Sequence, residues 1–269
     1  AVRDHGFPLI EVFATHTHFP YRDPAACDEV RAWLDDAGVT AWSVHAPICD
    51  GLRHGIWGRA YSNASRNAAV RDEAIAETLA SIDAAHRLGA SVLVVHLGIP
   101  VGQPIPADDN DPGAVARALR PVADRREQVG VRLAIEVIPN ALATADAVGA
   151  WLEGDWELGG AGACLDVGHA HLTGGAPEAV ERLSGHMVTT HIHDNRGQHD
   201  DHLVPFDGTV DWTATLGALS KVGYRSPLIF ELPDHGDAAR TLAKAVLARA
   251  RLQAILTEID APFPFTDDL

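Results

Sequence analysis

The chain has 269 residues, of which 46% are hydrophobic and 22% are charged, and its formal net charge at pH 7 is −16. This composition is close to that of an average soluble globular protein and excludes a disordered chain, a collagen and a disulfide scaffold. The surplus of 37 Asp and Glu over 21 Lys and Arg disfavours general binding to nucleic acid, because net negative charge repels a polyanion. We expect one large domain over residues 1–269, since barrels of alternating strands and helices commonly run to about 250 residues.

The cysteines and the hydropathy indicate the compartment. Cys27, Cys49 and Cys164 are far apart, odd in number and form no C-x-x-C pair, which is typical of a protein of the reducing cytoplasm. No apolar run approaches the roughly 18–20 residues that span a bilayer, and residues 1–25 lack the basic and apolar regions of a signal peptide. We therefore expect a cytoplasmic protein without a membrane partner.

Strand-like and helix-like segments alternate along the chain. Short apolar or β-branched runs recur about every 30 residues, and each is followed by a helical pattern, which predicts repeated βα units and a parallel sheet. The expected strands are Leu9–Ala14, Ala41–His45, Ser91–His96, Arg132–Val137, Ala163–Val167, Val188–His193 and Leu228–Leu232. The expected helices lie near residues 25–37, 67–88, 113–129, 144–153, 177–184, 212–221 and 237–256. Several of them are entered through Asp, Thr or Pro and end at a glycine.

A closed (β/α)₈ barrel needs eight units, whereas seven strands are readable here. The opening residues Ala1–Gly6 resemble the end of a helix that stops at a glycine. We therefore expect a (β/α)₈ TIM barrel whose first strand is missing or lies upstream of residue 1; the alternative is an open sheet of seven strands. Long loops over 46–66 and 98–112 follow strands and are expected to cover the mouth of the barrel.

Polar side chains stand at the ends of six consecutive strands, where a parallel barrel carries its functional face. They are His45, His96, Glu136, Asp166, His191 and Glu231. His169 follows Asp166 at i+3, and Asp200 and His202 form an Asp-x-His pair after the strand that carries His191. Imidazoles and carboxylates are suitable ligands for zinc, manganese or another divalent first-row metal.

Each of these residues taken singly is more often structural than functional. However, burying Glu136, Asp166 and Glu231 without cationic partners costs several kcal/mol each, and basic residues are absent from those strand ends. A metal ion supplies the missing positive charge. The set as a whole therefore predicts a metal site with one to three divalent ions, Zn or Mn, in each chain.

The chain resembles the xylose-isomerase-like barrel superfamily, which includes sugar isomerases, sugar epimerases and the apurinic/apyrimidinic endonuclease IV family. The resemblance spans residues 6–256 and is strongest in Asp166–His169, His191–Asn195, Asp200–His202, Phe206–Gly208 and Leu228–Glu231. In ketose epimerases one divalent ion is held by two Glu, an Asp and a His, which implies the ligands Glu136, Asp166, His191 and Glu231 here. The resemblance also implies substrate contacts from His169, His193 and Arg196.

In the endonuclease branch nine ligands bind three zinc ions, and the present chain matches all nine positions. The implied ligands are His45, His96, Glu136, Asp166, His169, His191, Asp200, His202 and Glu231. With one ion, the resemblance implies isomerisation or epimerisation of a sugar, in which Glu136 and Glu231 remove and return a proton through an enediolate. With two or three ions, a bridging hydroxide attacks phosphorus and a phosphoester is hydrolysed.

The loops at the mouth favour the first of these reactions. An endonuclease that bends a duplex and flips a base needs Arg and Lys in these loops, yet Ala46–Gly51 and Leu97–Gly102 carry none, and the chain has only two lysines, Lys221 and Lys244. The long loop is flanked by arginines, which we expect to lie on a solvated face; they are Arg53, Arg59, Arg66 and Arg71. We therefore expect a metal-dependent isomerase or epimerase of carbohydrate metabolism, acting on a sugar or sugar derivative. A multi-zinc phosphodiesterase is the alternative, and a non-catalytic barrel that senses or stores metal is a third. A homo-oligomer is compatible with the sequence.

Other residues remain open at this stage. Trp57, Tyr61 and Phe206 suit an apolar wall for a sugar ring, but loop aromatics equally often fix a loop to the barrel. His16 and His18 follow the first readable strand and are candidates for the pocket. The histidines expected to be surface or structural are those at positions 5, 54, 86, 171, 186, 199 and 235.

Overall fold

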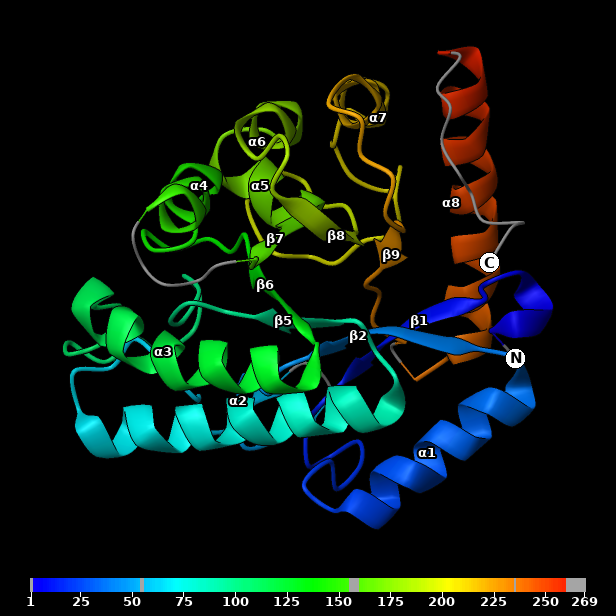
Figure 1. The fold of residues 1–269 in the computed structure, drawn as a ribbon. Coiled ribbons are helices and arrows are strands. Elements are labelled where there is room, and N and C mark those ends of the chain that lie inside the picture. The colour runs from blue at the N-terminus through cyan, green and yellow to red at the C-terminus, as the bar shows by residue number, and fades with distance from the viewer. Residues whose placement is uncertain (1, 54–55, 155–159, 235, 260–269) are drawn as a thin grey trace.

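The computed structural model describes residues 2–53, 56–154, 160–234 and 236–259. Its centre is a sheet of seven parallel strands in the order β1-β2-β5-β6-β7-β8-β9, so neighbours in the sheet are also neighbours in the chain. The strands are β1 (Leu9–Phe13), β2 (Thr40–His45), β5 (Val92–Val95), β6 (Arg132–Glu136), β7 (Gly162–Asp166), β8 (Met187–Ile192) and β9 (Ile229–Phe230). The sheet curves into a nearly closed barrel, with the strands around it in chain order (Figure 1).

Helices surround the sheet on its outer side (Figure 1). They are α1 (Pro24–Ala37), α2 (Ala68–Leu88), α3 (Pro112–Val129), α4 (Ala145–Glu153), α5 (Val167–Thr173), α6 (Ala176–Arg182), α7 (Trp212–Lys221) and α8 (Ala238–Glu258). Within the described ranges, no helix is both long enough and apolar enough to cross a bilayer.

All seven expected strands and all seven expected helices are present, and the predicted barrel class is confirmed. A 3₁₀ turn, η1 (Arg3–His5), ends at Gly6 with φ 80°, in line with the glycine stop that the sequence indicates. In the described part of the chain β1 and β9 form the two edges, and the rings of Phe7 and Phe230 bridge them at 5.8 Å. A strand upstream of residue 1 concerns residues outside this sequence and stays a prediction.

Local sequence sets the helix boundaries. The side chains of six capping residues accept hydrogen bonds from main-chain N–H groups of the first helical turn. These residues are Asp23, Asn67, Asp111, Thr144, Asp211 and Asp237. Three helices end at glycines with left-handed backbone, Gly38, Gly89 and Gly130.

The alternation of side chains along the strands separates two apolar regions and positions the polar residues. In β6, Leu133 and Ile135 face outward into the main core, which the strands share with the helices. Ala134 faces the barrel interior, where it belongs to a smaller cluster with Val92, Val94, Cys164 and Val188. The next inward-facing residue of β6 after Ala134 is Glu136. The polar side chains at the strand ends therefore lie directly above the apolar cluster inside the barrel.

Candidate metal centre

Four strands bring the first set of side chains together at the carboxyl end of the barrel. Asp166 and His191 are register partners in β7 and β8, Glu136 ends β6, and Glu231 follows β9. The Nδ1 atom of His191 lies 3.1 Å from Glu136 Oε1, 3.2 Å from Glu231 Oε2 and 3.7 Å from Asp166 Oδ2. We call Glu136, Asp166, His191 and Glu231 the central group. Each offers one ligand atom, and these atoms all lie within 4.8 Å of one another.

A second group shares Glu136 with the first. His45 at the end of β2 and His96 just after β5 direct their Nε2 atoms to Glu136 Oε2, at 2.9 and 3.0 Å. We call His45, His96 and Glu136 the β2–β5 group. The two oxygens of Glu136 therefore face different groups, and this carboxylate is placed to bridge two cations.

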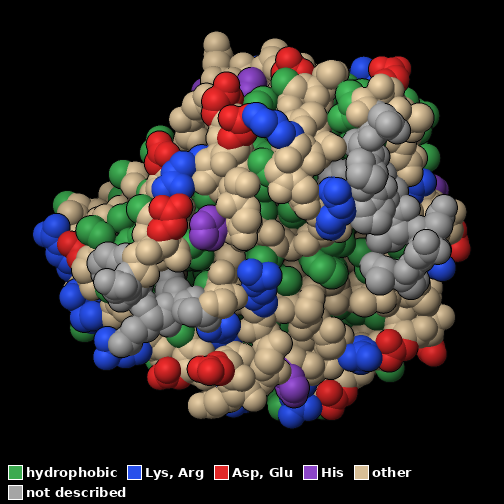
Figure 2. Space-filling model, turned by 45° about the horizontal axis from the view of Figure 1, so that its top comes forward, with side chains coloured by type: hydrophobic (Ala, Val, Ile, Leu, Met, Phe, Trp, Pro, Cys, Tyr) green, Lys and Arg blue, Asp and Glu red, His purple; other side chains and the backbone are tan. Residues whose placement is uncertain are grey.

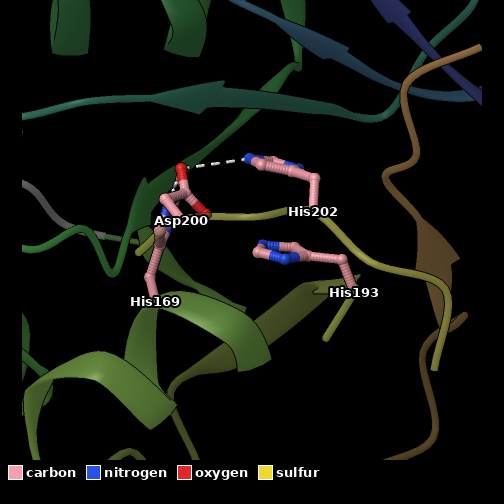
Figure 3. A group of neighbouring side chains, drawn as sticks. All are labelled: His169, His193, Asp200 and His202. Carbon is pink, nitrogen blue, oxygen red and sulfur yellow. Dashed lines mark hydrogen bonds and ion pairs between the residues drawn. The ribbon is translucent and has the colours of Figure 1, made fainter. Parts of the chain in front are cut away.

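A third group lies on the loop after β8 and on α5 (Figure 3). The Oδ2 atom of Asp200 lies 3.1 Å from the Nε2 atoms of both His169 and His202. The ring of His193 stacks on that of His202, with centroids 3.9 Å apart and planes 10° apart. We call His169, His193, Asp200 and His202 the loop group. The nitrogen His193 Nε2 lies 2.9 Å from Asp166 Oδ1, which links this group to the central group.

The segment 166–169 is built so that one residue serves two purposes. Asp166 ends β7 and also caps α5, because its Oδ1 accepts a 2.6 Å hydrogen bond from the main-chain N–H of His169. The helix then turns the His169 side chain towards the carboxylates. Gly168 is required between them, since a Cβ there would lie 2.1 Å from the ring of His193.

Asp194 holds the loop that carries Asp200 and His202. Its Oδ1 accepts from the main-chain N–H groups of Asn195 (2.9 Å) and Val210 (3.1 Å). Its Oδ2 accepts from Phe206 N and from the indole Nε1 of Trp212, both at 2.9 Å. The buried carboxylate thus ties both ends of residues 195–212 to the end of β8 and fixes the loop group in space.

The orientation of three histidines fits a bound cation. The Nδ1 atoms of His45, His169 and His202 lie 2.7, 3.1 and 3.3 Å from the main-chain oxygens of Ala46, Val137 and Glu231. A neutral imidazole that donates Nδ1–H to a carbonyl leaves its Nε2 lone pair free, and here each Nε2 faces a carboxylate oxygen. Lone pairs that face one another repel unless a cation or a proton lies between them. A metal ligand held by a carbonyl on its far nitrogen has this arrangement.

The electrostatics of the three groups indicate the same need for positive charge. Burial is the largest influence and favours neutral side chains, yet the surrounding carboxylates raise the pKa of His169 and His191 well above its ordinary value and that of His202 to about 9. In turn, despite burial, the histidines hold the pKa of Glu136 well below its ordinary range and that of Glu231 at about 2. Protons on imidazoles balance the carboxylates in the metal-free protein, and divalent ions are chemically suited to replace them.

A model of the family described as xylose isomerase-like TIM barrel matches residues 1–253. The chain belongs to this family. A protein of Methanocaldococcus jannaschii, uncharacterized protein MJ1311, is 26% identical over 253 residues, which are 89% of this chain and 80% of that protein. A protein of Sinorhizobium fredii, uncharacterized protein y4fM, is 48% identical over 73 residues, which are 27% of this chain. The matched segment is only 24% of the S. fredii protein.

Solved structures of similar fold cover nearly the whole chain. The crystal structure of a D-tagatose 3-epimerase-like protein has a TM-score of 0.75 at 24% identity and covers 96% of this chain and 91% of that one. A xylose isomerase domain protein from Planctomyces limnophilus has a TM-score of 0.78 at 21% identity, covering 96% and 92%. The IOLI protein with a bound zinc atom has a TM-score of 0.71 at 19% identity, covering 93% and 89%. At these identities the likeness establishes the fold.

All nine ligand candidates expected from the resemblance to this family come together in the three groups. His193, expected to contact substrate, is fully buried against Asp166 and His202. Arg196 is not among the described residues that line the cavity; its side chain is 62% exposed and lies 3.9 Å from Asp201. The substrate roles of His169, His193 and Arg196 stay predictions.

A cavity of about 2130 Å³ opens onto the three groups. His18 and Trp57 line it, whereas His16 does not and instead stacks on Tyr21 at 4.7 Å. Phe206 fixes its loop, because its ring packs against Trp212 and under the guanidinium of Arg251 at 3.7 Å.

Tyr61 lines a separate, smaller cavity, which Trp57 also lines. The guanidinium of Arg59 lies over the Tyr61 ring, 5.7 Å from its centre. Among the histidines expected to be surface or structural, His5, His86 and His199 are exposed and His171 and His186 half-buried, while those at 54 and 235 lie outside the described residues. His199 also lines the large cavity.

Positive charge is scarce in the cavity. Among the described lining residues the sole Lys or Arg is Arg249, whose guanidinium contacts the main-chain oxygen of Gly6 and lies 4.6 Å from the centre of the Phe7 ring. On the face shown in Figure 2, basic and acidic side chains are interspersed. This distribution provides little for a polyanion to bind, in agreement with the net charge of −16.

Sequence reasoning missed Glu11. It lies in β1, its side chain is 10% exposed, and its Oε1 is 3.0 Å from His191 Nε2. A signal was present, since Glu11 is the one charged residue of Leu9–Phe13 and its neighbours Ile10 and Val12 are apolar. A buried carboxylate on an apolar strand needs a hydrogen-bond donor or a cation as its partner, but the sequence pattern does not show which residue provides it.

Proposed function

We propose that the protein is a divalent-metal-dependent isomerase or epimerase that acts on a sugar or sugar derivative. The observation that carries the proposal is the central group, in which two glutamates at the ends of different strands flank a buried aspartate and histidine. Family membership supports it, as do the names of similar structures, among them D-psicose 3-epimerase and L-ribulose 3-epimerase. The zinc atom bound to the IOLI protein supports a metal in this fold.

Glu136 and Glu231 are placed to handle protons on two sides of a bound substrate. In the sheet β6 and β9 are separated by β7 and β8, so the two carboxylates reach His191 from different directions. When bound, a divalent ion supplies Lewis acidity that makes a C–H next to a carbonyl more acidic. One carboxylate takes that proton. For epimerisation the other group, starting as the carboxylic acid, returns a proton to the opposite face; for isomerisation one group carries the proton to the neighbouring carbon.

The test is exchange of substrate protons with solvent. A panel of neutral ketoses is incubated in D₂O with the zinc- or manganese-loaded protein, and deuterium uptake is followed by NMR. Glu136→Gln and Glu231→Gln are each expected to slow uptake by about 100-fold or more, because general acid–base groups contribute that much. Glu127→Gln, an exposed substitution on α3, is the matched control. Full-rate exchange in a folded, metal-loaded Glu136→Gln protein contradicts the assignment.

The second candidate is a multi-zinc phosphoester hydrolase, and the β2–β5 and loop groups favour it. They supply ligands for two ions beyond the central one. If His45 and His96 hold an ion, Glu136 bridges two cations and is no longer available as a base. Metal content per chain distinguishes the candidates: one ion supports the isomerase, whereas three ions with cleavage of a phosphodiester such as bis(p-nitrophenyl) phosphate support the hydrolase.

The remaining expectations also belong to this proposal. A neutral carbohydrate suits a cavity that is poor in Lys and Arg. The three cysteines are free and buried, which agrees with a reducing cytoplasm. The cytoplasmic location, a homo-oligomeric state and a single domain over residues 1–269 stay predictions.

A further inference from the structure

His191 differs from His45, His169 and His202 in the partner of its second ring nitrogen. Its Nδ1 atom faces the central group, and its outer nitrogen, Nε2, faces away from it. In His45 and His202 the nitrogen that faces away from the carboxylates, Nδ1, lies against a main-chain carbonyl. In His169 Nδ1 lies 3.1 Å from the main-chain oxygen of Val137, although carboxylate oxygens of Asp166 and Glu136 are also within 3.5 Å of it. His191 stands inside β8, where main-chain carbonyls lie in the plane of the sheet and its side chain points away from that plane. Its outer nitrogen therefore needs a partner from across the barrel interior.

Glu11 occupies that position. Its Oε1 lies 3.0 Å from His191 Nε2, a buried atom that makes no aligned hydrogen bond with the described residues. Because the distance is already that of a hydrogen bond, a small turn of the ring aligns the pair. The other oxygen, Oε2, accepts a 2.6 Å hydrogen bond from the hydroxyl of Ser43, the register partner of Glu11 in β2. Ser43 is fully buried, so this contact holds the carboxylate in one orientation.

We propose that Glu11 is a positioning residue of the metal centre: it accepts Nε2–H from His191, keeps the Nδ1 lone pair directed at the central group, and is itself held by Ser43. The inference rests on the proposed function insofar as that requires an ion at the central group. A carboxylate behind a histidine ligand fixes its tautomer and increases its basicity more than a carbonyl does. Such partners typically contribute about 10- to 100-fold to metal affinity.

The test reads the ring of His191 directly, apart from activity. The ¹⁵N signals of the histidine rings are recorded in the metal-free chain and during titration with zinc buffered by a chelator. The signals of His191 are assigned by their loss in His191→Gln. In the wild-type protein we expect zinc at Nδ1 and the proton at Nε2.

Three variants separate positioning from packing. Glu11→Ala is expected to weaken zinc binding at His191 by up to about 100-fold and to lose the fixed tautomer, and Glu11→Gln, which keeps size and an acceptor oxygen, by about 10-fold. Ser43→Ala is expected to have a smaller effect in the same direction, and Glu127→Gln none. If Glu11→Ala does not fold, Glu11→Gln and Ser43→Ala still decide the question.

The outcomes distinguish this inference from the proposed function. If the His191 signals of the wild-type protein do not respond to zinc or manganese, there is no ion at the central group and the proposed function fails with the inference. If the wild-type signals respond to zinc, and the His191 signals of Glu11→Gln and Glu11→Ala respond at the same zinc concentration with the same tautomer, only the role of Glu11 is refuted and the proposed function stands.

Discussion

Substitution of Asp194 by Asn tests how the loop group is held in place. The carboxylate accepts four hydrogen bonds, two on each oxygen, and all four donors are N–H groups. An amide has one oxygen only. Whichever way the substituted amide turns, its NH₂ faces two N–H donors, because each oxygen of Asp194 serves two of them.

The expected loss follows from that geometry. Two hydrogen bonds to a charged acceptor disappear, each worth about 1.5–3 kcal/mol, so Asp194→Asn destabilises the fold by about 3–6 kcal/mol. At about 2–4 °C per kcal/mol for a chain of this size, the midpoint of thermal unfolding falls by at least about 6 °C. Because the loop carries Asp200 and His202, zinc binding by the loop group weakens as well.

Asp207→Asn is the matched control, since it makes the same chemical change in the same loop. Asp207 pairs with Lys244 at 3.0 Å, and both side chains are 48% exposed, so its loss costs less than about 1 kcal/mol. Calorimetric unfolding and zinc content are measured for both proteins. Equal unfolding temperatures for the two variants refute the assignment of Asp194 as the anchor of the loop.

Three further outcomes are expected. Gly217→Ala in α7 stabilises the fold by about 0.5–1 kcal/mol in urea unfolding, because nothing lies within 4 Å of the added Cβ and a helix interior favours Ala; lower stability contradicts this. Gly162→Ala in β7 destabilises by about 1–3 kcal/mol in the same assay, since its Cβ would lie 2.5 Å from Val188 Cγ1 and 2.6 Å from the main-chain oxygen of His186. The pKa of His202, raised from 6.5 to about 9, means that the metal-free fold holds this proton more tightly than the unfolded chain. Its contribution to stability is full below pH 6.5 and disappears as the pH rises through about 9. Zinc binding at pH 7 therefore releases protons, which calorimetry in buffers of different ionisation enthalpy measures; the absence of any buffer dependence contradicts it.

The fold and the position of most candidate ligands could be predicted, because the βα repeat determines the barrel and the barrel determines where its strand ends lie. Repetition of βα units predicts a parallel barrel, and the ends of parallel strands meet on one face. A carboxylate or an imidazole at the end of an apolar strand, such as Glu136 or Asp166, therefore needs no further information to be placed near the others. The i+3 spacing of His169 indicates the same place, although α5 itself is too short to give a helical pattern in the sequence.

What the sequence could not provide depends on contacts across the barrel. Glu11 lies two positions before the end of β1, and its meaning depends on His191, which is far away in sequence and adjacent only after the sheet has curled. The hairpin of β3 (Leu52–Arg53) and β4 (Ile56–Trp57) consists of strands of two residues each, too short for alternation to show. The stack of His193 on His202 likewise arises from the folded loop, which Asp194 orders.

The arrangement of the ligands has a consequence for how the protein matures. The groups that share Glu136 draw their side chains from β2 to beyond β9. In the unfolded polymer an ion therefore finds only pairs of candidate ligands that are close in sequence, such as Asp166 with His169 or Asp200 with His202. Bringing the distant donors together costs chain entropy that a single ion in a flexible coil cannot easily offset. If the protein binds metal as proposed, loading is thus expected to follow collapse of the barrel, and newly made chains are expected to pass through a folded, ion-free stage.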